Sequence, residues 1–150
     1  MHASCILIAI SLGSDEHKFI VDQININQYY RGPDFKRIKN YDHFSFCHQR
    51  LSIIDLNKRS NQPFEYKNIE IIFNGEIYNY RELFKQLNLE YETKSDCEVI
   101  LHLYLKYGME QTIQMLDGVF SFVLYDKRKN HVYIGHDPIG VRSLYWFATE

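Results

Sequence analysis

The distribution of apolar residues predicts five β-strands. Residues 5–12 form an apolar run without helical period, which is typical of a strand buried on both faces. The third strand stops at Asn74-Gly75, a dipeptide that commonly forms turns. A polar turn joins the last two strands, so they are expected to form a hairpin. The predicted strands are residues 5–12, 44–48, 69–73, 119–125 and 131–135.

Helical spacing of apolar residues predicts three helices in the second half of the chain. The first covers residues 80–87. Ser95 and Glu98 have the spacing of a capping box, in which each side chain accepts a hydrogen bond from the other residue's backbone amide. A second helix is therefore predicted to begin there and to end at Gly108 in a left-handed cap. Residues 109–116 form the third predicted helix.

The order of these elements predicts the fold class. A strand and a short helix near residues 15–24 are followed by further strands, then by the three helices and the hairpin. Strands and helices do not alternate strictly, so we expect an α+β fold with an antiparallel or mixed sheet and segregated helices. The chain has 150 residues, no internal repeat and no linker. Residues 1–150 are therefore predicted to form one domain with its own core.

Composition and charge exclude several classes of function. The chain has 17 basic and 19 acidic residues, a net charge of −2 and no basic cluster, so no nucleic-acid partner is expected. The longest apolar run is too short to span a bilayer, so no membrane partner is expected. The seven His residues lack metal-ligand spacing, and no metal site is expected. Cys5, Cys47 and Cys97 form neither a disulfide framework nor a C-x-x-C pair, which favours a reduced, cytoplasmic setting.

Six motifs follow one another along the chain: Arg31-Gly-Pro-Asp34, His48-Gln-Arg-Leu-Ser-Ile-Ile-Asp55, Asn74-Gly-Glu-Ile-Tyr-Asn79, Ser95-Asp-Cys-Glu-Val-Ile100, Leu116-Asp-Gly-Val-Phe-Ser-Phe122 and Asp137-Pro-Ile-Gly-Val-Arg142. In this order they closely resemble the glutaminase domain of the glutamine-dependent asparagine synthetases. These are class II amidotransferases of the N-terminal-nucleophile superfamily. The resemblance implies a four-layer αββα sandwich that hydrolyses glutamine to glutamate and ammonia.

Several residues of these motifs suit the chemistry of glutamine. Arg50 has a planar fork of donors that fits an α-carboxylate, although a strand-end arginine in an exposed ion pair is the alternative. Asn74 and Gly75 offer an amide and a backbone N–H to an oxyanion, although an ordinary hairpin turn is the alternative. Asp96 is placed in the first turn of a predicted helix, where an acid complements the helix dipole. By resemblance Asp96 takes the substrate's α-ammonium group, and the two roles are compatible.

The resemblance also assigns roles residue by residue. It makes Asn74 and Gly75 the oxyanion hole and Glu76 a substrate contact. Other loop residues of the motifs, Arg31, Asp34, Asp137 and Arg142, are expected to be structural. The substrate-binding residues that the resemblance implies are Arg50, Leu51, Ser52, Ile53, Ile54, Asn74, Gly75, Glu76 and Asp96.

The nucleophile implied by the resemblance is a cysteine whose own α-amine acts as the base. The corresponding residue is Cys5, which starts the first predicted strand but follows residues 1–4. Three interpretations are open: residues 1–4 are removed as a propeptide, the true start lies elsewhere, or the nucleophile is lost. In the last case the domain is inactive and binds glutamine or a partner protein, and Cys5 is an ordinary buried cysteine. Cys47 and Cys97 lie within predicted elements with no free amine nearby and are poor candidates.

The resemblance implies that the ammonia passes to a synthetase domain or subunit that forms an amide. The phosphate-binding loop of that synthetase half is absent from these 150 residues. We therefore expect no cofactor in this domain, with ATP and Mg needed only by a separate synthetase domain. Glutaminase domains of this family run somewhat further than residue 150, so the sandwich is expected to lack late strands at its C-terminal end.

Overall fold

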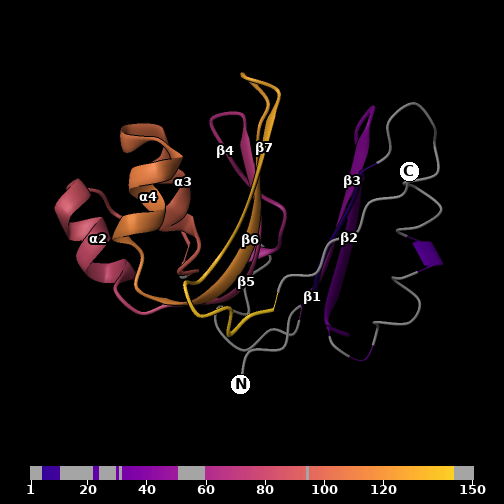
Figure 1. Ribbon diagram of the computed structural model, residues 1–150, viewed down its shortest axis with the longest axis horizontal. Helices are drawn as coiled ribbons and strands as arrows, with labels where there is room; N and C mark the ends of the chain where they lie inside the picture. The colour runs from indigo at the N-terminus through magenta and orange to yellow at the C-terminus, as the bar shows by residue number, and fades with distance from the viewer. Residues whose placement is uncertain are drawn as a thin grey trace.

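Two antiparallel sheets lie face to face, and helices cover the outer face of the larger sheet (Figure 1). The computed structural model describes residues 5–10, 22–23, 30, 32–50, 60–93 and 95–143, with the backbone alone for residues 5–10. Three layers are seen among these residues: helices, four-stranded sheet and three-stranded sheet. The predicted α+β class is confirmed. The short helix expected near residues 15–24 lies, apart from residues 22 and 23, outside the described residues.

The three-stranded sheet consists, in this order, of β1 (Cys5–Ile10), β3 (Phe44–Arg50) and β2 (Phe35–Asn40). Both outer strands pair with β3 in antiparallel register, so that Cys5 lies opposite Gln49 and Phe35 lies opposite Arg50. All seven residues of β3 are buried. Its middle position between β1 and β2 and the four-stranded sheet on its inner face contribute to this burial.

The four-stranded sheet consists, in this order, of β4 (Phe64–Tyr66), β5 (Ile69–Ile77), β6 (Gly118–Asp126) and β7 (His131–His136). The predicted hairpin is confirmed as β6 and β7. The sequence analysis did not predict β2 or β4. In β2, Lys36, Arg37 and Lys39 interrupt the apolar alternation, and β4 has only three residues. Both are edge strands, where short or charged strands are common.

The strand β5 is longer than predicted, because Asn74-Gly75 does not end it. Gly75 lies inside the strand, opposite Phe120, with a φ of +150°. A Cβ atom at Gly75 would lie 2.2 Å from the carbonyl oxygen of Val119. The close approach of β6 therefore requires a glycine at this position. The alternative of a hairpin turn at this dipeptide is wrong.

The three predicted helices are present as α2 (Tyr80–Leu87), α3 (Glu98–Tyr107) and α4 (Met109–Met115). Gly108 joins α3 to α4 with φ +81° and ψ 173°. It has the positive φ that was expected, but its extended ψ carries the chain directly into the next helix. The predicted left-handed cap is therefore only half right.

The predicted capping box at the start of α3 is wrong. The Glu98 carboxylate accepts hydrogen bonds from the backbone N–H groups of Glu92 and Thr93, each at 2.7 Å. The Ser95 N–H donates instead to Thr93 Oγ1 at 3.1 Å. The buried Glu98 therefore fixes the loop before α3 rather than the helix terminus itself.

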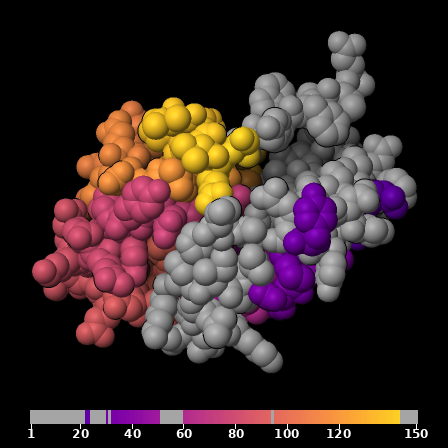
Figure 2. Space-filling view, turned by 90° about the horizontal axis from the view of Figure 1, so that it is seen from below, coloured from indigo at the N-terminus to yellow at the C-terminus, as the bar shows by residue number. Residues whose placement is uncertain are grey.

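The core between the helices and the four-stranded sheet is apolar. In the space-filling view the helical segments, coloured pink to orange, and the visible described residues of the N-terminal third, coloured indigo to purple, lie on opposite sides (Figure 2). In this helix-side core, Phe84 from α2 and Leu101 from α3 are almost completely buried. Sixteen of the described residues form the cluster: Ile69, Ile71, Phe73, Ile77, Leu83, Phe84, Leu87, Cys97, Val99, Ile100, Leu101, Leu103, Tyr104, Phe120, Phe122 and Leu124.

The layer between the two sheets is of mixed polarity. Its apolar part is a small cluster of Phe44, Phe46, Ile72 and Val123. The ring of Tyr41 stacks on Phe44 with 4.4 Å between the centroids. The hydroxyl of Tyr41 then donates to a carboxylate, and a group of charged side chains continues from there.

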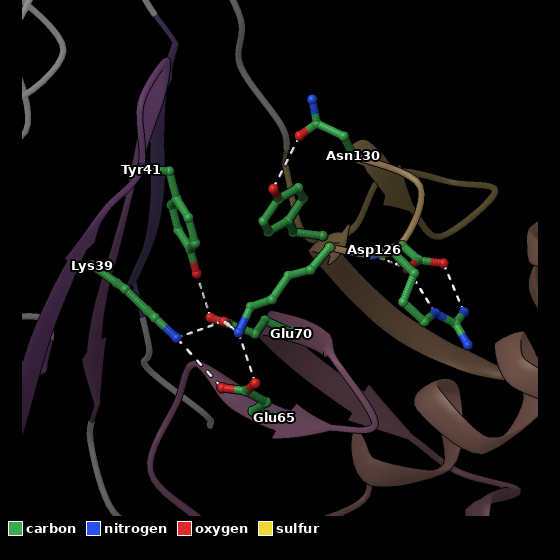
Figure 3. Close-up of polar contacts among 9 residues, drawn as sticks. Lys39, Tyr41, Glu65, Glu70, Asp126 and Asn130 are labelled. Atoms are coloured by element: carbon green, nitrogen blue, oxygen red, sulfur yellow. Dashed lines mark hydrogen bonds and ion pairs between the residues drawn. The ribbon is translucent and has the colours of Figure 1, made fainter.

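The inter-sheet ion cluster consists of Lys39, Tyr41, Glu65, Glu70 and Lys127 (Figure 3). The fully buried Glu70 from β5 binds Lys39 Nζ at 2.5 Å, the Tyr41 hydroxyl and Lys127 Nζ. Burial alone would raise the pKa of Glu70, but bonds from the two lysines and the tyrosine outweigh it and lower the pKa. The cluster therefore joins the two sheets through a carboxylate that stays ionised.

Candidate active site

The side chains of Asn74 and Glu76 are placed on the face of β5 that looks toward the three-stranded sheet. Side chains alternate between the two faces of a strand. Phe73 belongs to the helix-side core, whereas Ile72 belongs to the apolar cluster between the sheets. Asn74 and Glu76 continue the face of Ile72, and both are half-buried. Ile77 is again in the helix-side core, so the alternation persists through the end of the strand.

The backbone N–H of Gly75 points to the edge of β5 that β6 does not occupy. Alternate residues of a strand send their N–H groups to the same edge. The Phe73 N–H donates to Gln62 Oε1 at 2.5 Å, and the Ile77 N–H donates to Asp96 Oδ2 at 2.6 Å. Gly75 lies between these two residues. Its N–H is therefore directed between the Gln62 amide and the Asp96 carboxylate.

The strand opposite confirms this direction. Phe120 pairs with Gly75 in β6, but its own N–H donates to Asp137 Oδ2 at 3.2 Å, and its carbonyl accepts from the Asp137 N–H at 2.8 Å. The backbone of Phe120 therefore faces away from Gly75. The two residues form a pair without mutual hydrogen bonds, as the geometry of an antiparallel ladder allows.

The hydrogen bonds of Asp137 agree with the structural role that was expected for it. Its buried carboxylate also accepts backbone hydrogen bonds from Ile139, Val141 and Arg142, at 3.0 to 3.2 Å. These backbone bonds lower its pKa although burial opposes them. Asp34 is exposed, and Arg31 lies outside the described residues.

Arg50 lies at the end of β3 on the face that looks toward β5. It follows Phe44, Phe46 and His48 at every second position, and the first two belong to the apolar cluster between the sheets. Its residue exposure is 7%. The alternative of an arginine in an exposed ion pair is therefore wrong. Its Nη1 donates to Asn61 Oδ1 at 2.7 Å.

Asn61 and Gln62 connect Arg50 with β5. The Asn61 side chain binds the Arg50 guanidinium, and the next side chain, Gln62, binds the Phe73 N–H beside Asn74. The sequence analysis did not single out this dipeptide. The only signal in the sequence was a pair of amide residues before Pro63, which does not identify a site in a single sequence.

Asp96 reaches β5 at the same edge as Gln62, but further along the strand. It lies in the turn before α3, and not in the first turn of the helix as expected, because α3 begins at Glu98. Its hydrogen bond to the Ile77 N–H holds it at the end of β5. Asn74, Gly75 and Glu76 thus lie in the second half of β5, and Asp96 binds its end. Arg50 is connected to the same strand through Asn61 and the neighbouring Gln62.

Cys5 is described by its backbone alone. It lies opposite Gln49, the neighbour of Arg50 in β3, so its backbone starts β1 at the Arg50 end of the three-stranded sheet. The other predicted substrate-binding residues, Leu51, Ser52, Ile53 and Ile54, lie outside the described residues.

The two remaining cysteines are buried thiols. Burial, reinforced by the Asp96 carboxylate, raises the pKa of Cys97 to about 12, so it is not a thiolate at neutral pH. Within residues 22–23, 30, 32–50, 60–93 and 95–143, no group of His, Cys, Asp and Glu side chains could hold a metal ion. No helix in the described part of the chain is long and apolar enough to cross a membrane.

The fold and the motifs agree with a comparison against protein families. A family model described as "Glutamine amidotransferase domain" matches residues 4–150. The chain therefore belongs to the glutamine amidotransferase domain family. This confirms the resemblance on which the motif assignment was based.

Similar proteins are glutamine-hydrolysing asparagine synthetases. The chain is 42% identical over 126 residues to the one from Homo sapiens, and 49% identical over 134 residues to asparagine synthetase 1 from Arabidopsis thaliana. It is 44% identical over 133 residues to the nodule enzyme from Pisum sativum. Each match covers 81% of this chain and 22% of the relative. The chain thus spans about a fifth of the length of the relatives that it matches.

Proposed function

We propose that this domain hydrolyses glutamine to glutamate and ammonia at the second half of β5. The observation that supports this most directly is the Gly75 N–H, which points between Gln62 and Asp96 to a part of the β5 edge that no strand among the described residues occupies. A backbone donor held in a strand needs no reorganisation when negative charge develops near it. The half-buried Asn74 is the neighbouring residue and carries a second donor.

The proposed site binds both charged ends of the substrate. Arg50 takes the α-carboxylate through its planar guanidinium, which is matched to a carboxylate in geometry and charge. Asp96 takes the α-ammonium group, and Glu76 is a further substrate contact on the face that looks toward the three-stranded sheet. Leu51, Ser52, Ile53 and Ile54 complete the proposed set of substrate-binding residues.

The proposed nucleophile is Cys5, with its own α-amine as the base. The thiol loses its proton to the amine and attacks the amide carbon, while Asn74 and Gly75 stabilise the oxyanion. The protonated amine then gives its proton to the amide nitrogen, so that collapse of this intermediate releases ammonia and leaves a glutamyl thioester. Water hydrolyses the thioester to glutamate and regenerates the Cys5 thiol. This mechanism requires that Cys5 is the first residue of the mature chain, either because residues 1–4 are removed or because the true start lies elsewhere. The step requires no cofactor.

We further propose that the ammonia is used by a synthetase domain or subunit to form an amide, as the names of the relatives indicate. ATP and Mg would act in that part. A cytoplasmic, reducing setting is part of the proposal, because the described cysteines, Cys47 and Cys97, are free thiols.

Two substitutions test the site. Asn74→Ala removes a donor that acts on charge present only in the transition state, so kcat should fall about a hundredfold or more with little change in KM. Asp96→Ala removes a partner of the ammonium group, which is charged throughout the reaction, so KM should rise first. Steady-state glutaminase assays would measure both.

N-terminal sequencing and intact mass provide the complementary test. An active preparation should begin at Cys5 and lose activity on thiol alkylation. Full activity with residues 1–4 retained would contradict the free-amine mechanism. If turnover is absent but calorimetry shows glutamine binding that Asp96→Ala abolishes, the domain is a binding module and not an enzyme.

A further inference from the structure

We propose that Asn61 is a positioning residue that orients Arg50 for the α-carboxylate of glutamine. The inference rests on the proposed function, because it takes Arg50 to be the carboxylate ligand. Asn61 belongs to none of the six sequence motifs, and its role follows from one contact. Arg50 Nη1 donates to Asn61 Oδ1 at 2.7 Å inside the protein.

A buried arginine needs such a contact to present its fork in one direction. The side chain has many rotamers, and its planar head binds a carboxylate with two donors only when the plane is correctly turned. Arg50 is held at 7% exposure at the end of β3. A bond at one terminal nitrogen restrains the direction of the guanidinium, and it adds to the other contacts that Arg50 makes.

The chemical nature of the acceptor is equally important. Asn61 offers a neutral amide oxygen, which orients the guanidinium without neutralising its positive charge. A carboxylate at position 61 would form an ion pair with Arg50 and would compete with the carboxylate of the substrate. The pairing of a charged donor with a neutral acceptor therefore suits a guanidinium that has to bind an anion.

The position of Asn61 also couples the two halves of the proposed site. The next residue, Gln62, accepts the Phe73 N–H at 2.5 Å, immediately before Asn74. One dipeptide thus holds the proposed carboxylate ligand on β3 and the proposed oxyanion segment on β5. A displacement of this dipeptide would change the spacing between the two ends of bound glutamine.

The test compares three substitutions at position 61 by glutaminase kinetics and by calorimetry of glutamine binding. Asn61→Asp is almost isosteric, so a purely structural role predicts that it is the mildest change. Our inference predicts the opposite order. We expect Asn61→Asp to weaken affinity about 30-fold or more, Asn61→Ala about 3- to 10-fold, and Asn61→Gln, which keeps an amide oxygen, about threefold or less.

Separate measurement of KM and kcat makes the test more specific. The substrate carboxylate is charged in both the ground state and the transition state, so KM should rise while kcat stays within about twofold. Asn40→Ala is the matched control. Its Oδ1 likewise accepts a side-chain hydrogen bond, from Ser45 Oγ at 2.6 Å, but it lies at the end of β2. This control should leave KM and kcat unchanged.

The outcomes separate this inference from the proposed function. If Arg50→Lys leaves glutamine affinity unchanged in a folded protein, Arg50 is not the ligand and both proposals fail. If Arg50→Lys weakens binding but Asn61→Asp binds glutamine as tightly as the wild type or more tightly than Asn61→Ala, only the inference about Asn61 is overturned. The order Asp, Ala, Gln from weakest to tightest binding would establish it.

Discussion

The two faces of β5 are buried against very different surroundings. Toward the helices, Ile69, Ile71 and Phe73 join a large apolar cluster. Toward the other sheet, the intervening residues Glu70 and Ile72 meet an ion cluster and only a small apolar cluster. The first layer resembles an ordinary hydrophobic core, in which stability follows the apolar area that is buried. The second layer contains charges that were removed from water and are held by specific partners.

This difference explains where the candidate site lies. An apolar core gains stability from close packing but offers no donors or acceptors to a polar substrate. The inter-sheet layer already contains satisfied polar groups, and Asn74, Glu76 and Arg50 lie along the same layer. The helix-side face of β5 therefore contributes mainly to stability, whereas the proposed chemistry takes place on the face toward the other sheet. Substitutions on the two faces should differ in size and in their dependence on pH.

The largest expected effect is on the helix-side core. Phe84→Ala removes a ring that is 2% exposed, and we expect a loss of about 3–5 kcal/mol in the free energy of unfolding. Urea denaturation would measure it. Leu89→Ala, at a residue that is 46% exposed beyond the end of α2, is the control and should cost less than about 1 kcal/mol. A similar loss in both variants would contradict the contrast between core and surface.

A smaller effect is expected in the ion cluster. Glu70→Gln leaves Lys39 and Lys127 without their buried carboxylate, and we expect a loss of about 1–3 kcal/mol at pH 7. Glu65→Gln is the matched control, because Glu65 binds the same two lysines but is half-exposed. It should cost less than about 1 kcal/mol. Equal losses would show that burial of the carboxylate is unimportant.

The pH dependence of the Glu70→Gln effect has a definite sign. The pKa of Glu70 is lowered in the folded protein from an ordinary value of 4.5. Its stabilising contribution is therefore complete above pH 4.5 and is lost as the pH falls through the folded pKa. The stability difference between wild type and Glu70→Gln should shrink in acid. A difference that grows below pH 4.5 would contradict this assignment.

The smallest expected effect at neutral pH concerns His48. This ring is completely buried in β3, and within the part of the chain that the structure describes its nitrogens have at most a weak contact with the Phe73 backbone and no well-formed hydrogen bond. Replacement of a polar group in this situation by an apolar one of similar size is nearly neutral or stabilising. His48→Leu should therefore change the free energy of unfolding by about 1 kcal/mol or less at pH 7.5.

The wild type and His48→Leu should differ in their free energy of unfolding when the pH is lowered. Burial, together with the charge of Arg50, lowers the pKa of His48 to about 3 from 6.5. Between these values only the unfolded chain takes up the proton, so the folded state loses stability as the pH falls below 6.5. From pH 7.5 to pH 5 the wild type should lose about 2 kcal/mol more than His48→Leu. If the free energies of unfolding of the two proteins changed in parallel with pH, His48 would take up its proton in the folded state as readily as in the unfolded chain.

The sequence predicted the elements whose patterns are local. The apolar spacing of Leu83, Phe84 and Leu87 identified α2, and the alternation from Phe44 identified β3. Tertiary context decided the elements that were missed or misjudged. The strand β2 was missed because Lys36, Arg37 and Lys39 interrupt the apolar alternation. Lys39 binds Glu70 across the sheets, and no local pattern shows such a partner.

The candidate site was predictable in its residue types but not in its connections. The motifs identified Arg50, Asn74, Gly75 and Asp96, because their chemistry matches a doubly charged amide substrate. The motifs did not show that Asn74-Gly75 continues the strand, since a glycine required by the close approach of β6 resembles a turn glycine in sequence. They also did not indicate Asn61, whose role depends on a partner eleven residues away along the chain.

The ion cluster has a consequence for the order in which the chain is made. Its bonds join Lys39 to Glu70 over 31 positions and Glu65 to Lys127 over 62 positions. A ribosome therefore releases the three-stranded sheet well before the strands that cover its inner face. Phe44 and Phe46 remain open to water during that interval, and fragments that end before β5 should aggregate. Such distant contacts also slow folding, so synthesis itself sets the earliest moment at which the two sheets close on each other.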